Sequence, residues 1–384
     1  MSAKKTKVGI ISANWSLKVH GTAWRNLPGV EVAAICTAHR ETAEAAAQQF
    51  GIGNAYWDHR KMLEDDELDI IDLGTRPSFR QSMVLDALRA GKHVYSALPF
   101  ATDLASAVSI EEARRENGVV GVVDAQFRWV PAALHMKKMI DSGFLGKPLG
   151  FNVQLFLPLV RQGELLYPHS AYPGAGVAPY KWLAEKDSGA GGWRNFATHS
   201  LLLLTHMLGP VAEASGRVDL GVPTWTLPDA SVLESGNEDL GVATLCLRNG
   251  AIGSLQAGWS VPDAAGLRFE VWGDKGRILL VDPGFGDGIS ARLYRGDARP
   301  VDYGQSAGEW LEIPKEYFAV PGTPFNVDNA PPMMVSMGWM FHHMLAAIEG
   351  SEAASPSFSE AVHVQQVVEA VLQSSRDRTW KSID

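Results

Sequence analysis

The first 125 residues alternate short, continuous apolar runs with amphipathic stretches, and this alternation constrains the fold more than any other feature. The apolar runs expected as strands are Lys7–Ser12, Val30–Cys36, Leu68–Leu73, His93–Ser96 and Val119–Ala125. Helical patterns lie between them, at His20–Asn26, Glu41–Phe50, Phe79–Ala90 and Leu104–Asn117. Apolar strands separated by helices are typical of a parallel sheet covered on both faces. The sequence therefore predicts an N-terminal α/β domain of the Rossmann, dinucleotide-binding type, residues 1–126.

The remaining residues, 127–384, have a different pattern. Strand-like runs separated by turn residues lie at Leu149–Pro158, Val211–Gly221, Leu240–Arg248, Ala251–Trp259, Arg268–Trp272 and Arg277–Leu280. The pair Asn249-Gly250 stands where a hairpin turn is expected. Helical patterns lie at Ala190–Leu208, Val335–Ile348 and Ser359–Asp377. These features predict a second, α+β domain with a largely antiparallel open sheet.

Composition narrows the class of protein. The 34 Lys and Arg residues against 43 Asp and Glu residues give a formal net charge of −9, which argues against a nucleic-acid partner. The richest apolar run, Leu201–Leu204, is far shorter than the ~20 residues that a membrane span needs. The two distant cysteines, Cys36 and Cys246, do not make a disulfide framework. We therefore expect a cytoplasmic protein without a nucleic-acid or membrane partner.

The first strand leads into a helix, which is where a dinucleotide-binding fold keeps its phosphate loop with the pattern G-x-G-x-x-G. Here Ser12, Asn14 and Leu17 hold the three glycine positions, and Trp15 lies in the same turn. Glycine allows positive φ and a close backbone approach; Asn tolerates positive φ and Ser is small, whereas Leu17 should push the helix outward. Two interpretations stay open: a working phosphate loop, or a Rossmann sheet that has lost its ligand.

The end of the second strand normally carries an acidic residue for the adenosine ribose. This chain has Thr37, Ala38, His39 and Arg40 there, with no acid. A hydroxyl followed by His and Arg suits a 2′-phosphate, which favours NADP over NAD. The alternative is that Arg40 is only a solvated residue at the start of a helix.

Short motifs spread over nearly the whole chain occur in a characteristic order. They are Val8-Gly-Ile-Ile followed by His20, Leu27-Pro-Gly-Val-Glu-Val, Gly74-Thr75-Arg-Pro77, Ala87-Leu-Arg-Ala-Gly-Lys-His-Val94, Ile140–Pro148, Tyr180-Lys-Trp182, Gly189-Ala-Gly-Gly192 followed by His199, and Phe269–Gly276. Together they resemble the glucose–fructose oxidoreductase/inositol dehydrogenase (Gfo/Idh/MocA) family. The resemblance implies an NAD(P)-dependent oxidoreductase, with Thr75 and Pro77 near the nicotinamide, and a homodimer or homotetramer formed through the open sheet of the second domain.

Two departures from the family pattern bear on the chemistry. The family's E-K-P motif is Ala97-Leu98-Pro99 here, so Leu98 replaces the lysine that, by resemblance, binds nicotinamide and assists proton transfer. Asn195 replaces the family aspartate four residues before His199. Both losses resemble the branch that contains the fungal galactose-pathway repressor, a regulator that binds a dinucleotide on this fold.

A base for an alcohol proton must come from another residue, because Leu98 cannot ionise. His199 is the best surviving candidate, since its ordinary pKa is near neutrality and Asn195, on the same helix face, can orient it. Lys181 could supply the missing charge, and Tyr95 could donate a proton. The alternatives are a satisfied core histidine, a surface lysine and a packed strand tyrosine, respectively.

Tyr172 lies in a loop before the candidate catalytic helix and Trp193 at its start, so we predict that both contact a ring-shaped substrate, although Trp193 equally fits core packing. No metal-binding motif is present, and no metal site is expected. The sequence thus predicts an NAD(P)-dependent dehydrogenase that acts on a hydroxyl of a sugar, sugar conjugate or related cyclic alcohol. Two alternatives remain: a non-catalytic dinucleotide-binding sensor or regulator, and a redox-neutral lyase or glycosidase-type enzyme with a bound nicotinamide cofactor.

Overall fold

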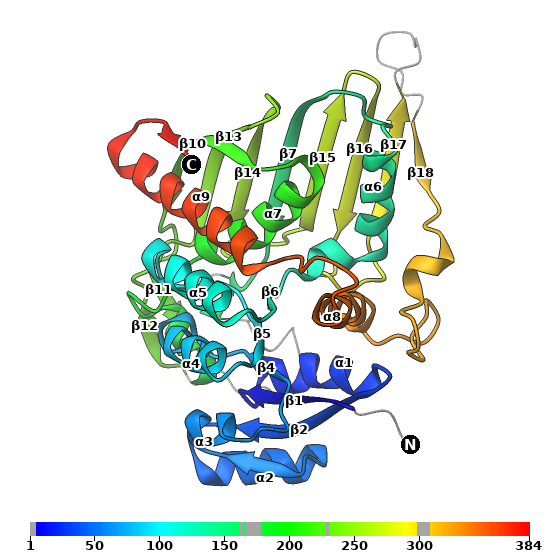
Figure 1. Ribbon diagram of the computed structural model, residues 1–384. Helices are drawn as coiled ribbons and strands as arrows, with labels where there is room; N and C mark the ends of the chain where they lie inside the picture. Colours follow the sequence, from blue (N-terminus) through cyan, green and yellow to red (C-terminus); the bar gives the residue numbers. More distant parts are fainter. Residues whose placement is uncertain (1–4, 162–163, 166–177, 228–229, 298–307) are drawn as a thin grey trace. The chain divides into compact units, whose positions relative to one another are not determined.

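The computed structural model describes residues 5–161, 164–165, 178–227, 230–297 and 308–384 (Figure 1). The chain packs as two compact units, Met1–Gln126 with Ala319–Val362, and Phe127–Phe318 with His363–Asp384. The predicted boundary after residue 126 coincides with the first division. Residues 319–362, which the sequence placed in the second domain, pack instead with the first unit.

The first unit contains a six-stranded parallel sheet in the order β3-β2-β1-β4-β5-β6. Its strands are β1 (Thr6–Ile11), β2 (Val30–Cys36), β3 (Asn54–Tyr56), β4 (Ile70–Leu73), β5 (His93–Ser96) and β6 (Gly121–Val123). Between them run η1 (Ser16–His20), α1 (Gly21–Asn26), α2 (Arg40–Phe50), α3 (His59–Leu63), α4 (Pro77–Arg89) and α5 (Leu104–Asn117). The predicted Rossmann fold is confirmed. In such a sheet, ligands bind at the carboxyl ends of the strands, where the strand order reverses between β1 and β4.

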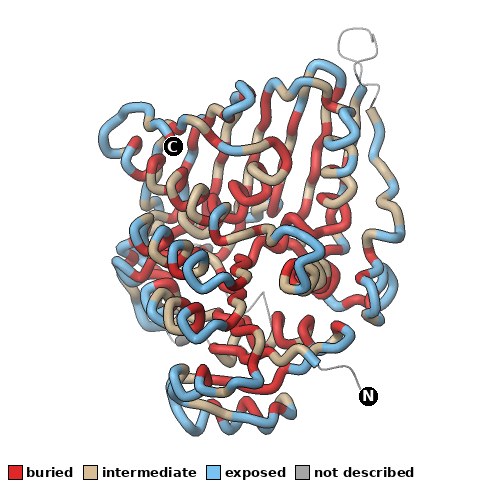
Figure 2. The backbone as a smooth tube through the Cα atoms, in the orientation of Figure 1, coloured by how far each residue is buried: buried red, intermediate tan, exposed pale blue. Residues whose placement is uncertain are grey.

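Local chemistry explains these boundaries. Figure 2 shows the buried residues concentrated along the strands, as expected for continuous apolar runs. The Asp58 carboxylate caps α3 by accepting the Arg60 N–H at 2.9 Å, and Asp103 caps α5 in the same way. Gly118 ends α5 with φ 63°, a left-handed conformation that favours glycine.

Helix α8 (Met334–Ile348) explains why residues 319–362 join the first unit. The Phe341 ring stacks on the indole of Trp24, with centroids 3.7 Å apart and planes at 6°. The methionines of this helix are core residues, and Met340 Sδ lies 3.6 Å from the Tyr95 hydroxyl. The apolar pattern predicted the helix correctly, but a periodic pattern does not say which distant surface the helix covers.

The second unit is built on a nine-stranded sheet in the order β18-β17-β16-β15-β7-β14-β13-β10-β19. Its strands are β7 (Pro148–Phe156), β10 (Val211–Asp219), β13 (Leu240–Leu247), β14 (Ile252–Gly258), β15 (Gly266–Gly273), β16 (Gly276–Asp282), β17 (Arg292–Asp297), β18 (Glu309–Leu311) and β19 (Lys381–Ser382). Every described pair is antiparallel except β7 with β14. The predicted, largely antiparallel α+β domain is confirmed.

Helices cover one face of this sheet. Figure 1 shows α6 (Pro131–Asp141) and α7 (Gly192–Leu208) lying over it, and α9 (Phe358–Asp377) begins in the first unit and continues into the second. Short 3₁₀ turns are η2 (Gln126–Trp129), η3 (Ala178–Leu183) and η4 (Lys315–Phe318), and a small sheet joins β8 (Val160–Arg161), β9 (Glu164–Leu165), β11 (Thr224–Thr226) and β12 (Val232–Glu234). Over the described residues, no helix combines the length and apolar character that crossing a membrane requires.

Candidate functional site

The backbone at the end of β1 has a conformation that normally requires glycine. Ser12 has φ 131°, which residues with a side chain rarely adopt. Its N–H donates to the Cys36 carbonyl oxygen at 3.1 Å, and its Oγ accepts the Asn14 N–H at 3.4 Å. Trp15 directly precedes η1, and its ring lies edge-on to His20 with centroids 6.4 Å apart. The loop therefore keeps a glycine-like geometry at its first position although the glycine is absent.

Close packing supports this loop from behind. Leu17, at the third glycine position, is fully buried in η1, whose π-type turn is wider than an α-helical turn. At the end of β4, a Cβ on Gly74 would lie 1.7 Å from Ser16 Oγ, so no larger residue fits there without a shift. The wider turn is where the chain accommodates the large side chain that the sequence predicted to push the helix outward.

Replacing Ser12 with glycine is expected to raise the free energy of unfolding by about 1 kcal/mol. A strained φ costs roughly 1–3 kcal/mol, which exceeds the roughly 0.5–1 kcal/mol of chain entropy that a glycine costs. Urea unfolding of the wild type and Ser12→Gly measures the difference. Ser78→Gly, at an exposed position of α4, is the control and should lower stability. A Ser12→Gly protein no more stable than the wild type would contradict strain at this position.

The predicted ribose-binding residues lie at the end of β2, beside the phosphate loop. Thr37 Oγ1 donates to the His39 carbonyl oxygen at 2.9 Å. Arg40 begins α2, pairs with Glu44 at 2.7 Å and lies over the Trp57 ring at 5.2 Å. The structure brings these residues together on an exposed surface, where Arg40 already has a carboxylate partner.

A buried arginine ties together the loops that follow β4 and β5. Arg80 is 2% exposed, and its guanidinium donates to the carbonyl oxygens of Thr75 at 2.8 Å, Ala97, and Pro99 at 2.5 Å. Burial lowers the pKa of Arg80 to about 9, although nearby carboxylates oppose this. Leu98, between two of these acceptors, is half-buried. Three predicted nicotinamide-side residues thus lie at the ends of neighbouring strands: Thr75, Pro77 and Leu98.

His20, the last residue of η1, is fully buried between two carboxylates. Its Nδ1 lies 3.0 Å from Asp72 Oδ1, and its Nε2 lies 3.4 Å from Asp124 Oδ2. Burial alone would lower the pKa of His20, but the charges and hydrogen bonds of the two carboxylates prevail and raise it to about 10. The Trp24 indole N–H donates to Asp72 Oδ2 at 3.0 Å. The raised pKa favours the protonated imidazole at neutral pH, placed between the two carboxyl groups.

Sequence reasoning missed this cluster, since it used His20 only as a position in a motif. The available signal was Asp72, a carboxylate inside the otherwise apolar strand Ile70–Leu73. A buried carboxylate needs a charged or hydrogen-bonding partner. His20 is the partner on the adjacent helix.

The acid–base role predicted for Tyr95 is corrected by its position. The side chain is fully buried, and its ring packs on His20 and Phe341 with centroids 5.1 and 4.9 Å away. Burial, together with the charges of Asp124 and Asp72, holds the pKa of its phenol well above the ordinary value of 10. An enclosed tyrosine of this kind packs the core and does not exchange a proton with a substrate.

In the second unit, Asn195 and His199 lie one turn apart on α7. His199 is 9% exposed, and its ring packs edge-on against Phe127 and Phe285, with centroids 5.7 and 6.0 Å away. Asn195 is half-buried, and its Oδ1 accepts no hydrogen bond from the described residues. An acceptor left open one turn from an imidazole fits the orientation of a ligand hydroxyl.

The substrate contact predicted for Trp193 is also corrected. The indole is fully buried, and its N–H donates to the Val368 carbonyl oxygen of α9 at 3.3 Å. Gly241 of β13 makes room for it, because a Cβ there would lie 2.5 Å from the indole. Trp193 packs α7 against the sheet, which leaves no face for a sugar. Lys181 is half-buried in η3 and stays a candidate, whereas Tyr172 lies outside the described residues.

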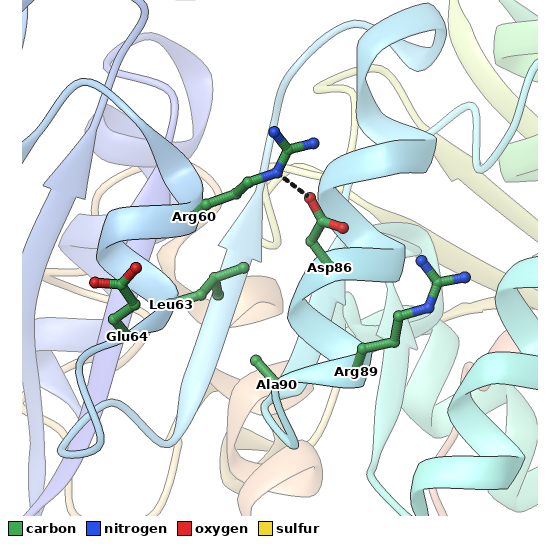
Figure 3. Close-up of a pocket in the computed structure, with 6 residues that line it drawn as sticks. All are labelled: Arg60, Leu63, Glu64, Asp86, Arg89 and Ala90. Carbon is green, nitrogen blue, oxygen red and sulfur yellow. Dashed lines mark hydrogen bonds and ion pairs between the residues drawn. The ribbon is translucent and has the colours of Figure 1, made fainter.

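A pocket of about 280 Å³ lies between α3 and α4 (Figure 3). It is lined by Arg60, Leu63, Glu64, Asp86, Arg89 and Ala90. Helix α4 begins at Pro77, beside the carboxyl ends of the strands, so its last turn lies at the opposite edge of the sheet. The pocket is therefore separate from the predicted site. Within the part of the chain that the structure describes, no group of three or more His, Cys, Asp or Glu side chains is arranged to hold a metal ion.

Comparison with known proteins places both units in one family. Residues 6–125 match the oxidoreductase family GFO_IDH_MocA, described as having an NAD-binding Rossmann fold, and residues 133–279 match the GFO/IDH/MocA C-terminal domain. The chain belongs to the Gfo/Idh/MocA family of oxidoreductases. Its first unit is the family's NAD-binding Rossmann fold.

Relatives and solved structures match this chain, most of them over nearly its whole length. Levoglucosan dehydrogenase of Pseudarthrobacter phenanthrenivorans is 23% identical over 98% of this chain and 97% of its own length. D-apiose dehydrogenase of Paraburkholderia graminis is 34% identical over 38% of this chain and 39% of its own. An NAD binding oxidoreductase from Klebsiella pneumoniae superposes with a TM-score of 0.85 over 99% of both chains, at 23% identity. A levoglucosan dehydrogenase in complex with NADH gives a TM-score of 0.81 over 99% of both chains, at 21% identity. These structures confirm the fold.

Proposed function

We propose that this oxidoreductase is a dehydrogenase acting on a ring hydroxyl of a sugar, sugar conjugate or related cyclic alcohol. The observation that carries the proposal is the pair Asn195 and His199 on one face of α7, in a chain of an oxidoreductase family. Relatives named for levoglucosan, D-apiose and scyllo-inositol dehydrogenation support the substrate class. His199 takes the hydroxyl proton, and Asn195 orients the hydroxyl or the imidazole. Lys181 is the remaining candidate for a charge near the substrate.

The residues at the carboxyl edge of the first unit fit a dinucleotide. The glycine-like φ of Ser12 is the backbone geometry of a diphosphate-binding loop, and the close packing of Ser16 on Gly74 supports that loop. Thr75, Pro77 and Leu98 would face the nicotinamide, which, when bound, supplies the hydride acceptor or donor. Because Leu98 cannot ionise, we assign to this edge the binding and orientation of the cofactor and no proton transfer.

We further propose that the end of β2 accepts NADP as well as NAD. At this position an acidic residue would repel the 2′-phosphate of NADP. Thr37 and Arg40 instead offer a hydroxyl and a guanidinium, which can bind that phosphate. Glu44 competes for Arg40, so a preference for NADPH requires Arg40 to leave that ion pair. The relative affinities of NADH and NADPH, and their change in Glu44→Gln, measure this competition.

The test of the proposed function combines binding with turnover. Titration of the protein with NADH and NADPH, followed by nicotinamide fluorescence, is expected to give micromolar affinity for at least one of them. A panel of levoglucosan, D-glucose, myo-inositol and mannitol is then followed by nicotinamide absorbance. Cofactor binding with oxidation of a cyclic member supports the proposal. Absence of binding to either cofactor would overturn it.

Leu98 and Asn195 favour one alternative function, a sensor or regulator related to the fungal repressor branch. Such a protein would bind dinucleotide and turn over no member of the panel. A redox-neutral lyase or glycosidase-type enzyme would form product with no net change in nicotinamide absorbance. Product analysis by chromatography on the same samples separates these two outcomes.

The open face of the nine-stranded sheet supports a proposed homodimer or homotetramer. Strand register places Ile252, Gly150 and Trp272 in one row, with Ile252 and Trp272 55% and 37% exposed. Val242, on the same face of β13, is also exposed. A second copy of the chain is the partner that would cover these apolar groups, and light scattering of the purified protein gives the oligomeric state. The cytoplasmic location stays a prediction.

A further inference from the structure

One loop of the second unit holds an aromatic ring against His199. Phe285 lies between β16 and β17, and its ring centroid is 6.0 Å from that of His199. The same ring lies 5.4 Å from Phe127 and 5.9 Å from Phe196, in both cases nearly perpendicular. Since Phe127 also packs on His199, two phenylalanine rings from different elements enclose the imidazole.

The backbone that presents this ring is strained. Phe285 has φ 53°, in the left-handed region that favours glycine and that bulky residues rarely adopt. Glycines stand on both sides of it, and Gly286 has φ 74°. A strained residue persists only where its surroundings fix the conformation, and such positions cluster at functional sites. A ring required only to fill the core would not need this backbone.

A buried carboxylate braces the loop on both sides of the ring. Asp282, at the end of β16, is fully buried and accepts the N–H groups of Gly284 and Gly286, each at 2.9 Å. Burial and the neighbouring Asp287 raise the pKa of Asp282 to about 6, so the carboxylate is charged at neutral pH and above. A Cβ on Gly284 would lie 2.1 Å from Asp287 Oδ2, so the turn admits no larger residue without a shift. The loop is therefore built to hold one conformation.

We propose that Phe285 is a positioning and specificity residue: the braced loop holds its ring in edge contact with His199, where it excludes water and gives the C–H face of a cyclic substrate an apolar wall. This inference rests on the proposed function, because it takes His199 as the acid–base group. Removing water from one side of an imidazole directs its proton exchange toward a substrate. Aromatic rings beside sugars favour substrates with an apolar ring face over open-chain polyols.

The first experiment needs no turnover. Phe285→Gly removes the ring, while glycine adopts the left-handed φ without strain, so the loop backbone is retained. Diethyl pyrocarbonate modification near neutral pH, located by mass spectrometry, is expected to become several-fold faster at His199. His206 on the same helix and the exposed His39 are internal references and should keep their rates. An unchanged rate at His199 in a folded variant would overturn the proposal.

The second experiment separates positioning from stability. For the cyclic panel member that the wild type oxidises, Phe285→Gly should raise KM by up to about tenfold, with a smaller change in kcat. Phe285→Leu, which restores apolar bulk, should recover much of that KM, and mannitol kinetics should change little. Equal KM values in all three proteins would contradict the apolar wall. If the wild type oxidises no panel member, the proposed function fails, and the modification rates alone decide whether Phe285 covers His199.

Discussion

Replacing His199 with alanine is expected to lower kcat by about 10²–10⁴-fold while leaving NADH binding nearly unchanged. Tyr95 is enclosed in the core of the first unit, so His199 on α7 is the leading acid–base candidate in the described structure, with Lys181 of η3 as the second. Because His199 is 9% exposed, its removal also leaves a cavity. His206→Ala, two turns along the same helix, is the matched control and should retain turnover. Circular dichroism and thermal unfolding of both variants separate misfolding from lost chemistry.

A variant of the neighbouring Asn195 tests the same proton path. Asn195→Asp places a carboxylate one helical turn from His199, and an opposite charge at that spacing raises the pKa of an imidazole. The acidic limb of the pH profile of kcat should therefore move to higher pH in Asn195→Asp. The proposed proton path would be wrong for both residues if His199→Ala turned over as fast as the wild type. The same conclusion would follow if the pH profile of kcat were unchanged in Asn195→Asp.

Elements defined by local chemistry were predictable from the sequence. The apolar run Val30–Cys36 coincides with β2, and the Asn249-Gly250 turn joins β13 to β14. Strand periodicity and turn residues are local properties, so they survive folding unchanged. The partner of α8 was not predictable, because the pattern of Val335–Ile348 marks an apolar face without naming Trp24 as the surface that it covers.

The site was predictable where topology alone fixes position. Ser12, Thr37 and Thr75 follow adjacent parallel strands, whose carboxyl ends meet at one edge of the sheet. Burial was not predictable, and this is why Tyr95 was predicted to donate a proton and Trp193 to contact the substrate, although both pack the core. An aromatic residue looks the same in sequence whether its ring faces a ligand or a neighbouring helix.

A stability that falls as the pH rises is expected from His20. Its folded pKa is about 10, whereas an unperturbed histidine titrates near 6.5. The folded chain therefore holds a proton that the unfolded chain has lost between these values. The resulting stability is complete below the unfolded pKa and is lost as the pH rises toward the folded one, with a limiting slope of about 1.4 kcal/mol per pH unit. Urea unfolding between neutral pH and the onset of cysteine ionisation measures this slope.

Replacing His20 with glutamine should abolish the slope and destabilise the protein by about 3–5 kcal/mol at neutral pH, because Asp72 and Asp124 then lack a cationic partner between them. The double variant His20→Gln/Asp72→Asn should recover part of this loss, since it removes one uncompensated buried charge. His39→Gln, at an exposed position, should keep the wild-type slope. A His20→Gln protein with the wild-type pH dependence would show that the imidazole is neutral in the folded chain.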